Sequence, residues 1–372
     1  MQFQQIIGQT NLKQELIQEI NSGKIAHAQL LQGTAGYGGL PLALAFSQFL
    51  FCTDRGAQDS CGRCASCQKV QQLQHPDLHF VFPVVLSIGK NSDFFLADWR
   101  TQLQQNPYFD LFDWTERIDD KLRKPVIGTD ESKEIIRKLS LKGYEGGYKV
   151  MIIWQPEQMN ADCANKLLKI LEEPPAQTLF LLVSEDASKL MITIQSRTQL
   201  LRVPKISADE LSAYLQETKS QTRTNADAIA AFADGSVLAA MSYLSTSENQ
   251  DQQRNQFIQL MRVCYKKEVL AMMNWADDIA SIGKERQKLF IQYALHMLRQ
   301  SILTNYMGDT LTKVSDEEAA FLEKFAPFIS GNNIREFIST FDAAYFQIDR
   351  NANARILFTQ LCFQTMRFIH QA

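Results

Sequence analysis

The segment AQLLQGTAGYGGLPLALAFSQFLF, residues 28–51, combines a strand, a glycine-rich turn and a helix in direct succession. The apolar run Ala28–Leu31 suits a short buried strand, and the turn Gly33–Leu40 contains four glycines. From Pro41 onward, four apolar residues recur on one face of a helix: Leu42, Ala45, Phe46 and Phe49. A strand that passes through a glycine turn into a helix is typical of α/β domains with a parallel sheet.

Two later segments repeat this alternation of strand and helix. KVMIIW at Lys149–Trp154 and TLFLLV at Thr178–Val183 are nearly continuous apolar runs, as expected of strands that are buried on both faces. Between them, Asn160 can cap a helix that ends before Pro174. We therefore predict a parallel sheet with helices on both faces over about the first 200 residues.

The segment after Pro204 differs, because its apolar residues recur at helical spacing almost throughout. Helices are predicted at Ala208–Leu215, at Ala226–Tyr243 with a break at Gly235, and, at the end of the chain, at about Asn353–Ile369. The polar stretch Ser245–Arg254 is expected to link two helical domains. The C-terminal part is therefore predicted to be all-α.

Composition excludes several classes of protein. The 38 Lys and Arg residues against 41 Asp and Glu residues give a net charge of −3, so no bulk positive field favours nucleic acid or an anionic membrane. The first residues lack the basic start and apolar core of a signal peptide, and glutamines and glycines interrupt the longest uncharged stretch, so we expect no membrane span. Seven cysteines, four of them close together, suit a metal site in a reducing compartment. We expect a cytoplasmic globular protein.

The glycine turn has the spacing of the phosphate-binding P-loop, G-x-x-x-x-G-K-[ST]. Its glycines are Gly33, Gly36, Gly38 and Gly39. In a functional loop, backbone N–H groups surround the phosphates, the Lys neutralises them and the hydroxyl holds Mg²⁺. Here Gly39 replaces the Lys and Leu40 replaces the Ser or Thr. On these residues alone, a glycine-rich turn without a ligand is favoured over a nucleotide site.

The strand Lys149–Trp154 has the position of a Walker B strand, which ends in an Asp for Mg²⁺ and a Glu that polarises water. Trp154 and Gln155 occupy those two places. Glu157 lies two residues too far along to replace the missing acid. We therefore expect that this chain does not bind or hydrolyse ATP.

Four cysteines follow the pattern C-x8-C-x2-C-x2-C: Cys52, Cys61, Cys64 and Cys67. Thiolates two residues apart can bind one ion in a tight knuckle, and Cys52 can complete a tetrahedron, so we predict a structural zinc site. The alternative is an iron–sulfur cluster, although the C-x3-C-P element that accompanies such clusters is absent. Four clustered free thiols are the least favoured interpretation, because they would be prone to oxidation.

Ser196-Arg197 follows an apolar segment at the expected rim of the sheet. An exposed Arg at such a place is ordinarily one partner of a surface ion pair. The functional alternative is an arginine finger, whose planar guanidinium stabilises charge on a transferring phosphoryl group.

Together these motifs resemble the bacterial clamp-loader subunits of the AAA+ class. The motifs that carry the resemblance are the Gly33–Leu40 loop, the four cysteines, His75-Pro76-Asp77, KVMIIW, ANKLLKILEEPP at Ala164–Pro175, Ser184 and Ser196-Arg197. Within this class the chain is similar to the delta-prime subunits of DNA polymerase III, because both nucleotide motifs are degenerate while Ser-Arg persists. A weaker resemblance extends to Ala233–Leu244 and Asn351–Leu361.

The resemblance implies a P-loop AAA+ α/β domain with a parallel sheet, followed by all-α lid and collar domains. The implied bounds are 1–204 for the α/β domain, with a zinc module at about 52–67 and an insertion at about 79–126, then 205–247 for the lid and 250–372 for the collar. The implied complex is a pentameric ATPase that opens a ring-shaped sliding clamp and places it on primed DNA. In it, this chain would be a rigid stator without catalysis of its own, although the complex belongs to a DNA-directed DNA polymerase holoenzyme.

Partners and site residues follow from the same resemblance. The implied partners are the delta and gamma/tau subunits, the sliding clamp and, through the complex, primed DNA, with no membrane. Arg197 would act as a finger in trans on a neighbour's nucleotide, and Ser196 would orient its loop. Two alternatives remain open, namely an ATP-hydrolysing gamma/tau-like subunit and a zinc-containing nucleic-acid adapter.

The insertion contains seven aromatic residues within 21 positions: Phe94, Phe95, Trp99, Tyr108, Phe109, Phe112 and Trp114. We predict an extra helical subdomain that buries its own aromatic side chains. Base stacking is disfavoured because the same segment is rich in Asp, which repels phosphate. A protein partner is the better functional interpretation.

Overall fold

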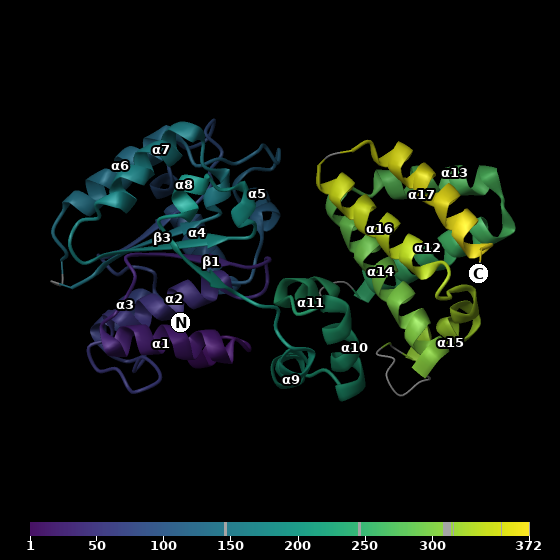
Figure 1. Ribbon diagram of the computed structural model, residues 1–372, viewed down its shortest axis with the longest axis horizontal. Helices are drawn as coiled ribbons and strands as arrows, with labels where there is room; N and C mark the ends of the chain where they lie inside the picture. The colour runs from purple at the N-terminus through teal and green to yellow at the C-terminus, as the bar shows by residue number, and fades with distance from the viewer. Residues whose placement is uncertain (145–146, 245–246, 308–313, 315, 351, 372) are drawn as a thin grey trace. The chain divides into compact units, whose positions relative to one another are not determined.

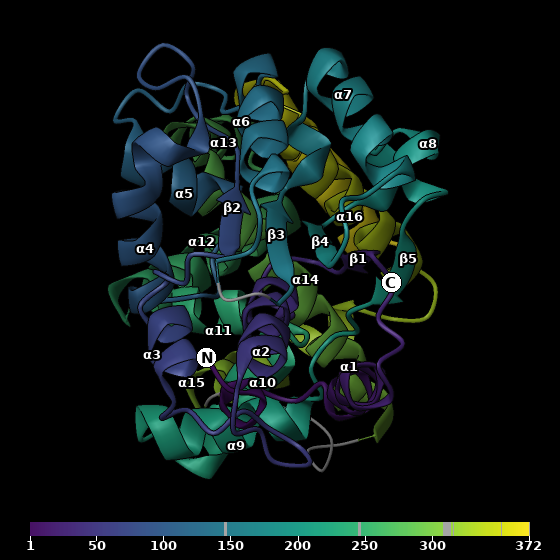
Figure 2. The same ribbon diagram turned by 90° about the vertical axis from the view of Figure 1, so that its left-hand side faces the viewer.

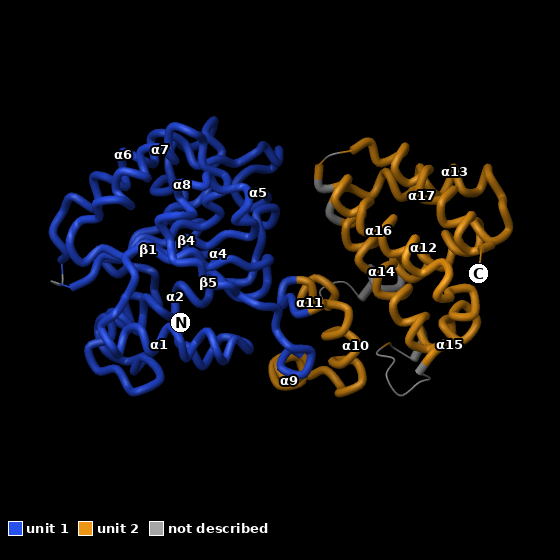
Figure 3. The backbone as a smooth tube through the Cα atoms, viewed as in Figure 1, with its two compact units in different colours: residues 1–211, 235–238 blue, residues 212–234, 239–372 orange. Residues whose placement is uncertain are grey.

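The computed structural model describes residues 1–144, 147–244, 247–307, 314, 316–350 and 352–371. The chain forms two compact units, of which the first comprises residues 1–211 and 235–238 and the second residues 212–234 and 239–372 (Figure 3). The first unit is α/β and the second is all-α. The finer division into an AAA+ domain, a lid and a collar stays a prediction, and residues 245–246, in its lid–collar boundary region, lie outside the described residues.

The first unit is built on a five-stranded sheet in which every pairing is parallel, as predicted. The strands are β1 (Ala28–Gln32), β2 (Leu78–Val81), β3 (Lys149–Trp154), β4 (Thr178–Ser184) and β5 (Gln199–Arg202). Their order across the sheet is β2-β3-β4-β1-β5, which Figure 2 shows from left to right. Every residue of β3 and β4 is buried, which explains why these two segments are continuously apolar.

Alternate residues of β3 enter two different cores. Val150, Ile152 and Trp154 face one core, whereas Met151 and Ile153 face the other, because side chains alternate across a strand. The helices of the first core are α1 (Thr10–Ser22), α2 (Gly39–Phe51), α3 (Ala65–Gln71), α4 (Leu96–Gln105) and α5 (Leu111–Ile118). Those of the second core are α6 (Thr129–Ser140), α7 (Ala161–Glu172) and α8 (Ile192–Gln195). Figure 1 shows α6 and α7 on one side of the sheet and α1 and α2 on the other.

The predicted insertion at about 79–126 overlaps β2 and then forms α4 and α5. Its two ends are joined by an antiparallel bridge in which the backbones of Val84 and Val126 exchange two hydrogen bonds of 3.0 Å. Its aromatic side chains Trp99 and Trp114 are fully buried, and Trp99 packs on Trp154 of β3, which lies outside the insertion, with 5.3 Å between the ring centroids. The insertion is therefore part of the core on one face of the sheet, not a separate subdomain.

The second unit contains only helices among its described residues. They are α10 (Arg223–Ala233), α12 (Ser247–Lys266), α13 (Val269–Ser281), α14 (Lys284–Met307), α15 (Asp316–Phe325), α16 (Ile334–Asp349) and α17 (Ala354–Ile369), while α9 (Ala208–Lys219) and α11 (Val237–Leu244) belong partly to each unit. Asn353 caps α17 through its side chain, so the predicted last helix is confirmed. The predicted linker Ser245–Arg254 is helical from Ser247 onward. Within the described ranges, no helix combines the length and the hydropathy that a bilayer span requires.

Candidate metal centre and glycine loop

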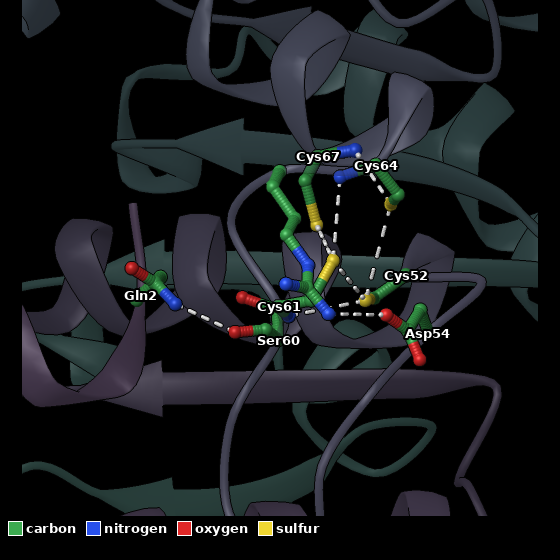
Figure 4. Close-up of polar contacts among 8 residues, drawn as sticks. Gln2, Cys52, Asp54, Ser60, Cys61, Cys64 and Cys67 are labelled. Carbon is green, nitrogen blue, oxygen red and sulfur yellow. Dashed lines mark hydrogen bonds and ion pairs between the residues drawn. The ribbon is translucent and has the colours of Figure 1, made fainter.

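The four cysteines predicted from their spacing lie together in the structure. Cys52 follows α2, Cys61 lies in the connecting loop, Cys64 caps α3 and Cys67 lies within that helix (Figure 4). All four sulfur atoms lie within 4.8 Å of one another. The Sγ atom of Cys52 is 3.6 Å from that of Cys61 and 4.0 Å from that of Cys64. Four sulfurs bound to one tetrahedral ion at 2.3 Å are about 3.8 Å apart, so these side chains already have the spacing that a metal requires.

Backbone N–H groups support negative charge on these sulfurs. The N–H of Cys61 donates to Cys52 Sγ at 3.3 Å, and the N–H of Cys64 donates to Cys61 Sγ at 3.3 Å. Burial acts to raise the pKa of Cys64, but hydrogen bonds from the Cys67 backbone and from Thr53 outweigh it and lower that pKa to about 6. The pKa of Cys52 is raised by burial, and that of Cys67 is raised by burial and by the neighbouring thiols, so these two sulfurs would become thiolates when a metal ion replaces their protons. Four sulfurs at this spacing fit one metal ion.

The cysteine module also fixes the N-terminal segment of the chain. The Asp59 carboxylate, between Cys52 and Cys61, accepts the N–H groups of Phe3 at 3.1 Å and Gln4 at 3.0 Å. The Gln2 side-chain amide donates to the Ser60 carbonyl at 2.6 Å (Figure 4). The candidate metal centre therefore lies in a loop that is bonded directly to residues 2–4.

The glycine loop keeps its glycines for reasons of backbone geometry. Gly36 has φ +87° and Gly38 has φ +101°, a region that favours glycine. A Cβ atom on Gly36 would lie 2.1 Å from Ser236 Oγ, because the segment before α11 packs directly on the loop. The Val237 N–H donates to the Gly36 carbonyl at 3.0 Å. The backbone conformation of Gly36 and Gly38 and the packing on Gly36 account for these two glycines without a bound phosphate.

Little space remains in front of this loop. The cavity there has a volume of about 30 Å³. It is lined by the loop itself, by the ends of β3 and β4, and by Pro107, Tyr108 and Phe109 of the insertion. Ligand pockets usually have about 300–1,000 Å³, so this cavity can hold about one water molecule.

The end of β3 has become part of the hydrophobic core. Trp154 is only 3% exposed, and its ring centroid lies 5.3 Å from that of Trp99 and 4.9 Å from that of Phe109. Gln155 donates from its amide to the Glu185 carboxylate. Glu157 accepts the Glu185 N–H at 3.0 Å, and burial raises its pKa. The positions of the two Walker B acids are thus occupied by a core side chain and a structural amide.

Ser196 and Arg197 lie near the amino-terminal ends of the strands, whereas the glycine loop lies at their carboxyl-terminal ends. Gly33 follows the carboxyl end of β1, whereas Arg197 precedes β5, which runs parallel to β1 with Gln29 opposite Gln199. The structure therefore does not bring Arg197 to the chain's own glycine loop. Ser196 is exposed, and its hydroxyl donates to the Thr193 carbonyl at 3.1 Å.

Arg197 forms an ion pair with Glu172 at the end of α7. Its guanidinium also donates to the Thr193 carbonyl at 2.8 Å, and its side chain is 33% exposed. Sequence reasoning did not predict this partner, although Glu172 lies within the ANKLLKILEEPP motif. The ordinary interpretation of Arg197, a surface ion pair, thus describes the free chain.

The family model described as "DNA polymerase III, delta subunit" matches residues 8–207, more than half of the chain. The chain belongs to this family. Its match to DNA polymerase III subunit delta′ of Bacillus subtilis (strain 168) is 32% identical over 186 residues, 50% of this chain and 44% of the relative. For subunit delta′ of Escherichia coli (strain K12) the identity is 29% over 187 residues, 50% of this chain and 45% of the relative. These matches span a little under half the length of the two relatives.

The predicted resemblance to delta-prime subunits is confirmed by these relatives. The predicted fold class, a parallel α/β domain followed by a helical part, is also confirmed for the described residues, whereas its assignment to the AAA+ class stays a prediction. A gamma subunit-related protein from Thermotoga maritima is similar over 96% of this chain and 99% of its own, with 13% identity and a TM-score of 0.40.

Proposed function

We propose that this chain is the non-hydrolysing stator subunit of the DNA polymerase III clamp loader, which supports ATP-dependent loading of the sliding clamp on primed DNA in replication. The observation that carries the proposal is the glycine loop. It lacks the Lys and the hydroxyl at Gly39 and Leu40, faces Trp154 where an acid is needed, and has a cavity of only about 30 Å³. A site that has no cation to neutralise the phosphates, no ligand for Mg²⁺ and no room for a nucleotide cannot support phosphoryl transfer.

Arg197 is the residue through which a stator can still take part in hydrolysis. Its position at the opposite end of the strands from Gly33 supports action in trans, on the nucleotide of a neighbouring subunit. Ser196 stands beside it and orients the turn through Thr193. In this role Arg197 exchanges Glu172 for a phosphoryl oxygen, because a planar guanidinium recognises both kinds of anion.

The proposed partners are the delta and gamma/tau subunits, the sliding clamp and, through the complex, primed DNA in the cytoplasm. Residues 1–204 would form the AAA+ domain, 205–247 the lid and 250–372 the collar that holds the subunits together. This arrangement accounts for a chain with a net charge of −3, since the complex rather than this chain alone would contact DNA.

The metal of the cysteine module is proposed to be a structural zinc ion held by Cys52, Cys61, Cys64 and Cys67. Four thiolates leave no coordination position for a substrate, so the ion would supply folding stability rather than catalysis. The contacts of Asp59 and Ser60 with residues 2–4 support this structural role.

The experiment is a comparison of ATP turnover by the isolated chain and by the reconstituted clamp loader with and without it. We expect no turnover by the isolated chain and loss of clamp loading when it is omitted. Steady ATP turnover by the pure chain, abolished by a substitution in Gly33–Leu40, would favour the gamma/tau-like alternative. Normal clamp loading without the chain would contradict the stator role and favour a separate adapter.

A further inference from the structure

The segment between α4 and α5 lies against the glycine loop. This segment contains Asn106, Pro107, Tyr108, Phe109 and Asp110, and its three middle residues line the small cavity. Tyr108 is 6% exposed and Phe109 is 4% exposed. A loop between two helices normally lies at the surface, so the burial of two aromatic side chains at this place requires an explanation.

Tyr108, which lines the cavity, is also bound to the N-terminal segment of the chain. Its hydroxyl oxygen accepts the N–H of Ile7, 101 positions away in the sequence, at 3.3 Å. A ring carbon of Tyr108 lies 3.5 Å from where a Cβ on Gly38 would be, and Ile6 lies at 3.7 Å from the same point. The phenol ring therefore occupies the space directly over the glycine loop.

Phe109 closes the other side of the cavity. Its ring lies 4.9 Å from Trp154, the residue at the Walker B position, and 5.5 Å from Trp99 of α4. Aromatic pairs at these separations are favourable beyond their buried area. The end of β3 is thus covered by an apolar cluster where a metal-bound phosphate would need acids and water.

The segment is held firmly in this position. The Asn106 side chain donates to the Tyr108 carbonyl at 2.7 Å and accepts the Tyr108 N–H at 2.9 Å. Asp110 caps α5 by accepting the Asp113 N–H at 2.9 Å. Because both ends of the segment are fixed by hydrogen bonds, the two aromatic rings have little freedom to leave the cavity.

We propose that Tyr108 and Phe109 are an internal occupant of the degenerate nucleotide site, with the aromatic insertion serving to deliver them. The proposal rests on the proposed function and deepens it, since it assigns the insertion the task of keeping the AAA+ domain in one nucleotide-independent conformation. The site is then closed twice, chemically by the missing Lys and hydroxyl at positions 39 and 40, and sterically by the two rings.

The experiment separates these two closures by measuring ADP binding, with and without Mg²⁺, to the isolated full chain by calorimetry. The first variant restores the chemistry with Gly39→Lys and Leu40→Thr, where the added Cβ on Gly39 would meet Val183 Cγ1 at 3.2 Å. The second adds Tyr108→Ala and Phe109→Ala to the first. The third adds only Tyr108→Ala, which keeps Phe109 in the core should the second fail to fold.

We expect no ADP binding by the wild type, and in variants that lack the rings an affinity at least about 100-fold higher than in the first variant, because apparent affinity falls with the fraction of open sites. The matched control is Phe94→Ala in the first variant. Phe94 belongs to the same insertion but is 64% exposed, so its removal should not increase ADP binding.

Two results would overturn the proposal. One is equal ADP affinity in the first variant and in the folded variants without the rings. The other is absence of ADP binding in a folded variant that has both the restored residues and the open cavity. Either result leaves the stator role intact, because that role is measured separately by clamp loading with the wild-type chain. Conversely, a failure of clamp loading would not change the outcome of the ADP titrations.

Discussion

Arg197→Ala tests whether a residue that is ion-paired in the free chain acts on a neighbour's nucleotide. The substitution removes an ion pair with Glu172 and a hydrogen bond to the Thr193 carbonyl from a side chain that is 33% exposed. A surface ion pair contributes about 0–1 kcal/mol, and an exposed hydrogen bond about as much. We therefore expect a loss of about 1 kcal/mol, or about 2–4 °C in the melting temperature of a domain of this size, with assembly intact.

The expected effect on chemistry is much larger than the effect on stability. Arginine fingers supplied in trans increase the rate at their site by about 10³–10⁵. In a complex with several hydrolysing sites, Arg197→Ala should remove only the share of ATP turnover that belongs to one site. Clamp loading should decrease more than ATP turnover if loading requires ATP hydrolysis at every site. Arg197→Lys should not restore it, because an ammonium group cannot reproduce the planar, bidentate contact.

The measurement is DNA- and clamp-stimulated ATP turnover, together with clamp loading, in the reconstituted complex. Arg137→Ala is the matched control, because Arg137 is paired with Glu134 at 2.7 Å on the surface of α6 and has no proposed role. Glu172→Gln releases Arg197 from its partner and should preserve turnover. If Arg197→Ala assembles normally and matches wild type in both turnover and loading, Arg197 is only an ion-pair residue and the finger assignment is wrong.

The remaining predictions concern the metal centre and the pH dependence of stability. Purified protein should contain one zinc ion per chain by elemental analysis. Cys64→Ser or chelation should lower the melting temperature and speed amide hydrogen exchange at residues 2–4. The control Cys163→Ala, which lies outside the cluster, should keep the metal. A brown, iron-containing preparation would instead indicate an iron–sulfur cluster. Burial lowers the pKa of His79 from 6.5 to about 4. Between these two pH values His79 binds a proton in the unfolded chain but not in the folded chain. The free energy of unfolding should therefore decrease as the pH falls from 6.5 to 4. Urea unfolding at pH 7 and pH 5 should show a smaller decrease for His79→Gln, and an equal decrease in both proteins would contradict the assignment.

Features that depend on neighbouring residues could be predicted from the sequence. β3 and β4 are buried on both faces, so their apolar runs identify them without knowledge of their partners. Asn160 and Asn353 cap helices through bonds to residues three positions later, so the helix starts could be located. The cysteine spacing likewise predicted four sulfurs in one place, because three of them are separated by only two residues each.

Short or exposed elements were not predictable in this way. β5 is an edge strand of four residues, three of them exposed, and therefore lacks the apolar pattern of a buried strand. β2 has only four residues, which is too short for a recognisable apolar pattern, and most of it falls within the predicted insertion. Only its pairing with β3 in the folded sheet identifies it as a strand.

The sequence by itself determined the class of fold, the grouping of the four candidate metal-binding cysteines and the replacement of nucleotide-binding residues by Gly39, Leu40 and Trp154, because each depends on residue types at short spacing. Only the tertiary structure decided that Tyr108 covers the glycine loop and that Arg197 pairs with Glu172 away from that loop. The contact between Tyr108 and Ile7 joins residues 101 positions apart, and such contacts follow from how helices and strands pack rather than from any local pattern. The aromatic residues of the insertion show the same division, because their number was visible in the sequence while the core they enter was determined by packing against the sheet.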